Sequence, residues 1–179
     1  MKEPHYKALV LPPDHWHISM SDTFSKLNQY MPSMINVLIE LGYKKSEIYI
    51  KYRSEKQKNN FPPSDHEYVF KPGYGTLKNY LKKDVIVIGP PNSATIECLL
   101  NDIKYFTFEY LESFYANGAT DFKSLDLMRD IIFVANNTKE LKNNIKNNNL
   151  FKDNKNKDDL IYSDSINISD IVNKILNSS

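Results

Sequence analysis

The sequence predicts a doubly wound α/β domain built on a mostly parallel sheet of about six strands. Residues Val85–Ile88 form a continuous β-branched run, which is typical of a parallel strand covered on both faces. A Gly-Pro-Pro turn ends this strand, and Asn92 and Ser93 are favourable N-cap residues for a helix that begins there. Other apolar segments of strand length alternate with segments of helical spacing, which favours βα units and a parallel sheet.

The N-terminal part of the chain supplies the first βαβ unit. Ala8–Leu11 is predicted as a strand, and the polar and aromatic residues 14–29 as a long loop at its carboxyl end. Apolar residues at helical spacing predict a helix over Tyr30–Leu41, which Gly42 ends. The second strand is Glu47–Tyr52. Because a helix joins these two strands, they are expected to be parallel.

The remaining elements follow the same alternation. They are the strands Glu67–Lys71, Lys104–Glu109 and Ile131–Val134 and the helices Thr76–Leu81 and Thr138–Lys146. The Asn-, Lys- and Asp-rich residues 147–159 are expected to form an exposed, flexible linker. The amphipathic segment Ser165–Leu176 is predicted as a C-terminal helix packed back on the domain. We therefore divide the chain into a ligand-binding α/β domain, residues 1–146, and a linker with a closing helix, residues 147–179.

Composition restricts the classes of function. The formal net charge of +1 gives no electrostatic case for a nucleic-acid-binding protein. Cys98 is the single cysteine, so an intramolecular disulfide is excluded, and its apolar neighbours predict a core residue rather than a nucleophile. No apolar run approaches the about 20 residues that a membrane-spanning helix needs, and the N-terminal residues lack a signal-peptide core. We therefore expect a cytoplasmic protein without a transmembrane segment.

The candidate ligand site lies at the start of the helix that follows Val85–Ile88. Open α/β sheets bind ligands at the carboxyl edge of their strands, where the N–H groups of a helix N-terminus favour an anion such as phosphate. Ser93 and Glu97 are four residues apart and share one face of this helix. Lys51 and Arg53 lie at the carboxyl end of the second strand and are interpreted either as phosphate ligands at the same edge or as solvated surface charges.

Two loops carry further candidates. His15 and His17 lie beside a carboxylate and are interpreted either as contacts for an anionic ligand or as surface or packing residues. Two neighbouring histidines alone are a weak pattern for a metal site. Tyr74 lies between two glycines and either stacks on a base or fills a turn. The chain has no dinucleotide-binding glycine motif, Walker A motif, zinc motif or nucleophile elbow. No metal and no cofactor are therefore expected.

The segment Asp84–Glu109, DVIVIGPPNSATIECLLNDIKYFTFE, resembles the donor-binding half of GT-B-fold glycosyltransferases. The shared pattern is a strand, a Gly/Pro turn, a Ser/Thr-Ala/Ser-x-x-Glu helix start, a small loop and a strand. The chain is similar, over residues 8–146, to bacterial enzymes that build capsular or lipopolysaccharide sugars. The resemblance implies a three-layer, Rossmann-like domain whose substrate is a nucleotide-sugar.

The resemblance also assigns roles to residues. It implies that the helix start holds the diphosphate or sugar of the donor, through Asn92, Ser93, Ala94 and Thr95, and that Glu97 binds the ribose hydroxyls. Tyr74 and Gly75 match the loop that contacts the base, and Arg53 matches a basic position near phosphate. The chain departs from the family there, because the familiar Lys-x-His-Pro pattern is replaced by Lys-Tyr-Arg-Ser.

In this fold the acceptor and usually the catalytic base come from an N-terminal half that this chain lacks. The resemblance therefore implies that catalysis needs an acceptor-binding domain or subunit as partner, with peripheral membrane contact only through that half. Two alternatives stay open. One is a non-catalytic α/β module that binds a ligand or a protein. The other is a fragment of a sugar-nucleotide epimerase, because epimerases of this fold share the same helix start.

Overall fold

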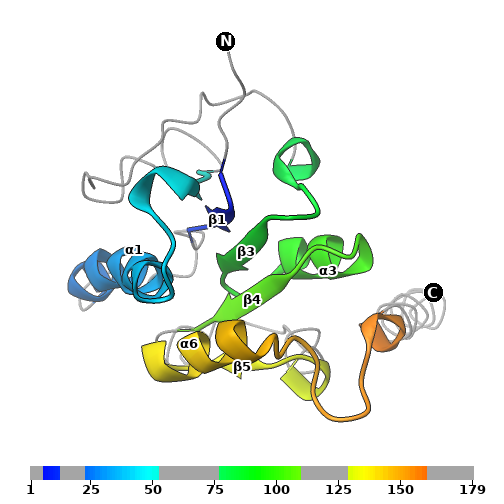
Figure 1. Cartoon of the computed structure of the whole chain (residues 1–179). Helices are drawn as coiled ribbons and strands as arrows, with labels where there is room; N and C mark the ends of the chain where they lie inside the picture. The colour runs from blue at the N-terminus through cyan, green and yellow to red at the C-terminus, as the bar shows by residue number, and fades with distance from the viewer. Residues whose placement is uncertain (1–5, 13–22, 53–76, 110–128, 161–179) are drawn as a thin grey trace, which may run out of the picture.

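The computed structural model describes residues 6–12, 23–52, 77–109 and 129–160. Within these ranges, five strands form one parallel sheet in the order β2-β1-β3-β4-β5 (Figure 1). The strands are β1 (Ala8–Val10), β2 (Ile48–Ile50), β3 (Ile86–Gly89), β4 (Tyr105–Phe108) and β5 (Val134–Ala135). The predicted α/β class and parallel sheet are confirmed. The one remaining predicted strand, Glu67–Lys71, lies outside the described residues.

Helices cover both faces of the sheet, so the domain has three layers. The helices α1 (Thr23–Glu40) and α6 (Thr138–Asn147) lie on one face, and α3 (Ser93–Leu100) lies on the other (Figure 1). Two short 3-10 helices, η2 (Lys45–Glu47) and η3 (Leu77–Tyr80), precede β2 and β3 respectively. The predicted short helix at 76–81 is therefore η3, whereas the predicted closing helix at 165–176 lies outside the described residues.

The order of the strands reverses between β1 and β3. Ala8 of β1 is opposite Ile48 of β2 on one side and opposite Ile86 of β3 on the other. The chain leaves β1 for α1 on one face of the sheet and leaves β3 for α3 on the other face. The two connections therefore diverge at neighbouring carboxyl ends, and in doubly wound sheets this is the position at which ligands bind.

The alternation of side chains along the strands divides the core into two clusters. The cluster on the α1 and α6 face includes Val10, Ile50, Ile88, Phe108, Met34, Leu38 and Leu141. The cluster on the α3 face includes Leu9, Tyr49, Val87, Tyr105, Cys98, Leu99 and Leu160. Because every strand carries apolar side chains on both faces, burial of the sheet from both sides supplies the main driving force for folding.

Helix α1 is longer than the predicted helix. It begins at Thr23 rather than at Tyr30, so residues 23–29 of the expected loop are helical. Phe24 and Leu27 continue the helical spacing of Met31 and Met34 toward the N-terminus, so the sequence carries a signal for this extension that the prediction did not use. The end of the helix is as predicted: Gly42 has a φ of 95°, and its N–H donates to the carbonyl of Ile39 at 2.9 Å.

The strand predicted at Ile131–Val134 is displaced toward the C-terminus. Residues 129–131 form a helical turn, and Ile132 makes an isolated antiparallel bridge with Phe151 before β5 begins. A short apolar run suits a buried helical turn as well as a strand. Here Ile131 and Ile132 are both buried in the α3-face cluster, so packing rather than β propensity decides their conformation.

Apolar residues at both ends of the segment 147–160 pack on the domain. Residues 152–156 are exposed as expected. The apolar residues on either side of them are not: the N–H of Phe133 donates to the carbonyl of Leu150 at 3.1 Å, and Leu160 is fully buried in the α3-face cluster. The polar composition of the segment conceals these anchoring residues.

We expect Leu160→Ala to lower the free energy of unfolding by about 2–4 kcal/mol, because truncating a buried leucine removes contacts and leaves a cavity. Leu100→Ala is the matched control, since Leu100 is 37% exposed, and it should cost less than about 1 kcal/mol. Urea unfolding followed by circular dichroism measures both. Equal, small effects would show that residue 160 lies in an independent tail.

Candidate functional site

The last residue of β3 is packed too closely to carry a side chain. A Cβ built on Gly89 would lie 2.5 Å from the Tyr105 hydroxyl and 3.0 Å from the Cβ of Leu11. The N–H of Leu11 donates to the carbonyl of Ile88 at 2.8 Å, so the chain after β1 stays paired with β3 up to this edge. The Tyr105 hydroxyl donates to the Pro90 carbonyl at 2.7 Å. Glycine therefore allows β1, β3 and β4 to converge where the strand order reverses.

The first turn of α3 is capped by its own residues. The Asn92 side chain accepts a hydrogen bond from the N–H of Ala94 at 2.9 Å, and the N–H of Asn92 donates to the Thr95 hydroxyl at 3.1 Å. Thr95 is buried, and its own N–H donates to the Asn92 carbonyl at 2.9 Å. Both side chains thus satisfy orphan N–H groups of the helix, which is a structural role besides any contact with a ligand.

Ser93 and Glu97 are the exposed predicted residues of α3. Ser93 is the first residue of the helix, and Ala94 beside it is half-buried. Among the N–H groups of this first turn, which the structure describes in full, that of Ser93 is not used by the Asn92–Thr95 cap. Glu97 follows one helical turn later on the same face. This face therefore offers an N–H and a hydroxyl at the positive end of the helix dipole, with a carboxylate beside them.

Cys98 takes no part in this exposed face. Its side chain is fully buried, and burial, with a smaller contribution from the charge of Glu97, raises the pKa of the thiol to about 12. The thiolate is the nucleophilic form of cysteine, and at neutral pH it is scarcely populated at such a pKa. The prediction of a core residue is confirmed.

A buried ion pair at the end of β4 was not among the predicted site residues. The Glu109 side chain is 1% exposed and forms a salt bridge through Oε2 with a terminal guanidinium nitrogen of Arg129, which is 38% exposed. The N–H of Glu109 donates to the Ala135 carbonyl at 2.8 Å, so the residue continues the ladder between β4 and β5. A sequence signal exists: a carboxylate directly follows an apolar, aromatic strand.

Half of the predicted site residues lie outside the described part of the chain. They are Arg53, His15, His17, Tyr74 and Gly75. The structure therefore brings together Asn92, Ser93, Ala94, Thr95 and Glu97 on α3 and leaves the predicted phosphate-binding and base-binding loops untested.

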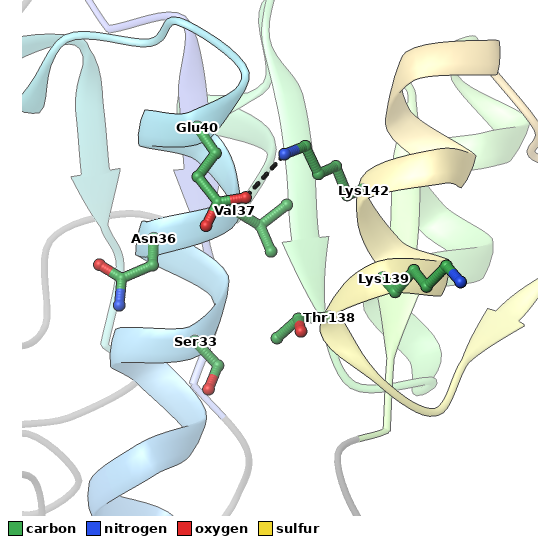
Figure 2. A pocket seen from close by; sticks show the side chains of 7 residues that line it. All are labelled: Ser33, Asn36, Val37, Glu40, Thr138, Lys139 and Lys142. Carbon is green, nitrogen blue, oxygen red and sulfur yellow. Dashed lines mark hydrogen bonds and ion pairs between the residues drawn. The ribbon is translucent and has the colours of Figure 1, made fainter.

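A polar groove of about 410 Å³ lies on the other face of the sheet, between α1 and α6 (Figure 2). Its lining consists of Ser33, Asn36, Val37, Glu40, Thr138, Lys139 and Lys142. Lys142 reaches across from α6 and pairs with Glu40 of α1 at 2.7 Å (Figure 2). None of the predicted site residues in the described part of the chain lines this groove.

Within ranges 6–12, 23–52, 77–109 and 129–160, no three His, Cys, Asp or Glu side chains gather in a way that would hold a metal ion. None of the helices in the described part of the chain is both long and apolar enough to cross a membrane. In comparisons with known proteins, no family model matches the chain, and neither a curated protein nor a solved structure gives a significant match.

We expect Gly89→Ala to lower the free energy of unfolding by about 1–3 kcal/mol, because the new Cβ overlaps the Tyr105 hydroxyl and Leu11. The cost should be smaller in a Tyr105→Phe background, where the nearest atom is absent. Gly42→Ala is the control: its Cβ meets nothing within 4 Å, so its cost of about 1 kcal/mol comes from the positive φ alone. A double-mutant cycle by urea unfolding gives these values, and a cycle without coupling would contradict the close packing.

We expect Cys98 to react slowly with Ellman's reagent in the folded protein at pH 8 and rapidly in urea, because the thiol is buried and protonated. The folded-state pKa of about 12 exceeds the unfolded value of about 8.5, so the unfolded state loses this proton first. Stability should therefore fall as the pH rises above about 8.5. Equal reaction rates with and without urea would contradict the burial of Cys98.

Proposed function

We propose that this domain binds a nucleotide-sugar and serves as the donor-binding half of a glycosyltransferase in bacterial surface polysaccharide synthesis. The observation that carries the proposal is the position of the β3–α3 unit. The motif by which the sequence resembles GT-B donor domains, from Asp84 to Glu109, includes strand β3, the turn at Gly89 and the start of α3. This unit lies at the reversal of the strand order, where parallel sheets bind ligands.

The chemistry of the α3 face is compatible with a phosphorylated, hydroxyl-rich ligand. The N–H and hydroxyl of Ser93 at the helix start favour an anionic oxygen, because the helix dipole is positive there. The Glu97 carboxylate accepts hydrogen bonds and suits the hydroxyls of a ribose. Because Asn92 and Thr95 cap the helix, fewer residues of this turn remain to contact the donor. We therefore expect donor affinity to depend most on Ser93 within this turn.

In such a domain, catalysis would be electrostatic. As the glycosidic bond to the nucleotide breaks, negative charge develops on the leaving phosphate, and fixed dipoles and cations aimed at it lower the barrier. The start of α3 supplies a dipole, and Arg53 is proposed as a cation. The acceptor and its base would come from a partner domain or subunit, so the isolated chain is expected to bind a donor without transferring the sugar.

We expect Ser93→Glu to weaken nucleotide-sugar binding by at least about tenfold, because a carboxylate about 4 Å from a phosphate repels it by 1–4 kcal/mol. The fold should be unaffected or slightly stabilised, because an acidic residue is favourable in the first turn of a helix. Calorimetric titration of the whole chain with UDP-, GDP-, CMP- and TDP-sugars measures the affinity, and thermal unfolding measures stability.

Thr138→Glu is the matched control. Thr138 is also the first residue of a helix, α6, but lines the groove between α1 and α6 on the opposite face. Its replacement should leave binding unchanged. If Thr138→Glu abolished binding while Ser93→Glu did not, the ligand site would lie in the groove. If none of the nucleotide-sugars bound to the folded protein, the proposed function would be wrong.

A further inference from the structure

The ion pair between Glu109 and Arg129 lies at the same edge of the sheet as the start of α3. In β4, Thr107 is opposite Gly89 of β3, and Glu109 is two residues further toward the carboxyl edge. Neighbouring strands are about 4.8 Å apart, and a strand rises by about 3.3 Å per residue. The backbone of Glu109 is therefore level with the turn that leads into α3.

The pair also lies on the α3 face of the sheet. Tyr105 is in the α3-face cluster, and side chains alternate along a strand, so Glu109 is on the same face as Tyr105. The N–H of Glu109 donates to the carbonyl of Ala135, so Glu109 continues the ladder between β4 and β5 and the alternation still applies to it. Ile131, two residues after Arg129, packs in the same cluster. Strand, pair and helix start thus share one face and one edge.

The geometry of the pair is that of an anchored guanidinium. Glu109 is buried, and Arg129 keeps more than a third of its side chain accessible. A guanidinium has five N–H donors in a rigid fork, and a single carboxylate oxygen does not use all of them. Because Glu109 restricts the conformations of Arg129, less side-chain entropy is lost when the exposed donors bind a second anion.

The use of arginine at this position is itself informative. The chain has 23 basic residues, of which Arg53 and Arg129 are the only arginines. A lysine would supply the same charge, but only a guanidinium supplies a planar fork that binds two oxygens at once. At position 129 the chain therefore offers a planar fork of donors that its many lysines cannot supply.

We propose that Arg129, held in position by Glu109, binds the phosphate groups of the ligand at the carboxyl edge of the sheet beside α3. The inference rests on the proposed function, which it deepens by naming the cation and the residue that positions it. Glu109 contacts no ligand; it is a positioning residue that acts through Arg129. Its negative charge also offsets that of Arg129, so recognition depends on directed hydrogen bonds more than on net charge.

Titration calorimetry of the whole chain with inorganic pyrophosphate and with the nucleotide-sugar panel tests this inference. Arg129→Lys, which keeps the charge and loses the fork, should weaken binding of both probes by about tenfold, the usual effect of losing a hydrogen bond to a charged group. Glu109→Gln still accepts a hydrogen bond from Arg129 and should bind within about threefold of the original protein. Lys142→Ala, which breaks the Glu40 ion pair on the opposite face, is the control and should have no effect.

The outcomes separate this inference from the proposed function. Pyrophosphate binding that depends on Arg129, without binding of any nucleotide-sugar, would support the anion site and overturn the proposed function. Nucleotide-sugar binding that is unchanged in Arg129→Lys and Arg129→Ala would overturn the inference and leave the function standing. Glu109→Ala, which removes the acceptor for Arg129, should weaken binding about as much as Arg129→Lys. Unchanged binding in Glu109→Ala would overturn the positioning role. Unfolding measurements on each variant confirm that only folded protein is compared.

Discussion

The close approach of three strands at Gly89 is the constraint on which the rest of the site depends. The space that a Cβ would need is taken by the Tyr105 hydroxyl and by Leu11. That same hydroxyl donates to the Pro90 carbonyl and so fixes the first residue of the turn. This turn also sets where α3 begins, because Asn92, two residues after Pro90, caps the helix. A larger residue at position 89 would push the neighbouring strands apart and displace the turn that follows β3.

The start of α3 illustrates a competition between folding and binding. A helix N-terminus attracts anions because its first N–H groups lack partners. Here Asn92 and Thr95 provide partners for most of those groups, which stabilises the helix and leaves mainly Ser93 for a ligand. The macrodipole of α3 remains, but few N–H groups of its first turn are left to donate hydrogen bonds to a ligand. Strong recognition of a phosphate at this edge therefore calls for a further cation, which is the role proposed above for Arg129, anchored by Glu109.

Several features could be predicted because they are local. The β-branched run before Gly89, the helix stop at Gly42 and the apolar spacing after Tyr30 each report on nearest neighbours along the chain, and all three are confirmed. Where the conformation of a segment depends on packing against residues distant in the chain, the prediction from sequence was less accurate. Of the run predicted as a strand, Ile131 ends a helical turn, Ile132 forms an isolated bridge with Phe151, and β5 begins only at Val134. The polar segment after residue 147 is followed by the buried Leu160.

By itself, the sequence determined the class of the fold, the βα unit that follows Val85 and the common helix face of Ser93 and Glu97, because period and capping are properties of a few adjacent residues. Only the tertiary structure decided which strands are neighbours, and therefore that the unit lies where the strand order reverses. It also decided that Glu109 meets Arg129, since the two are 20 residues apart in the chain. The physical reason is the same in both cases: strand pairing and burial bring together residues whose separation along the chain carries no signal of their contact.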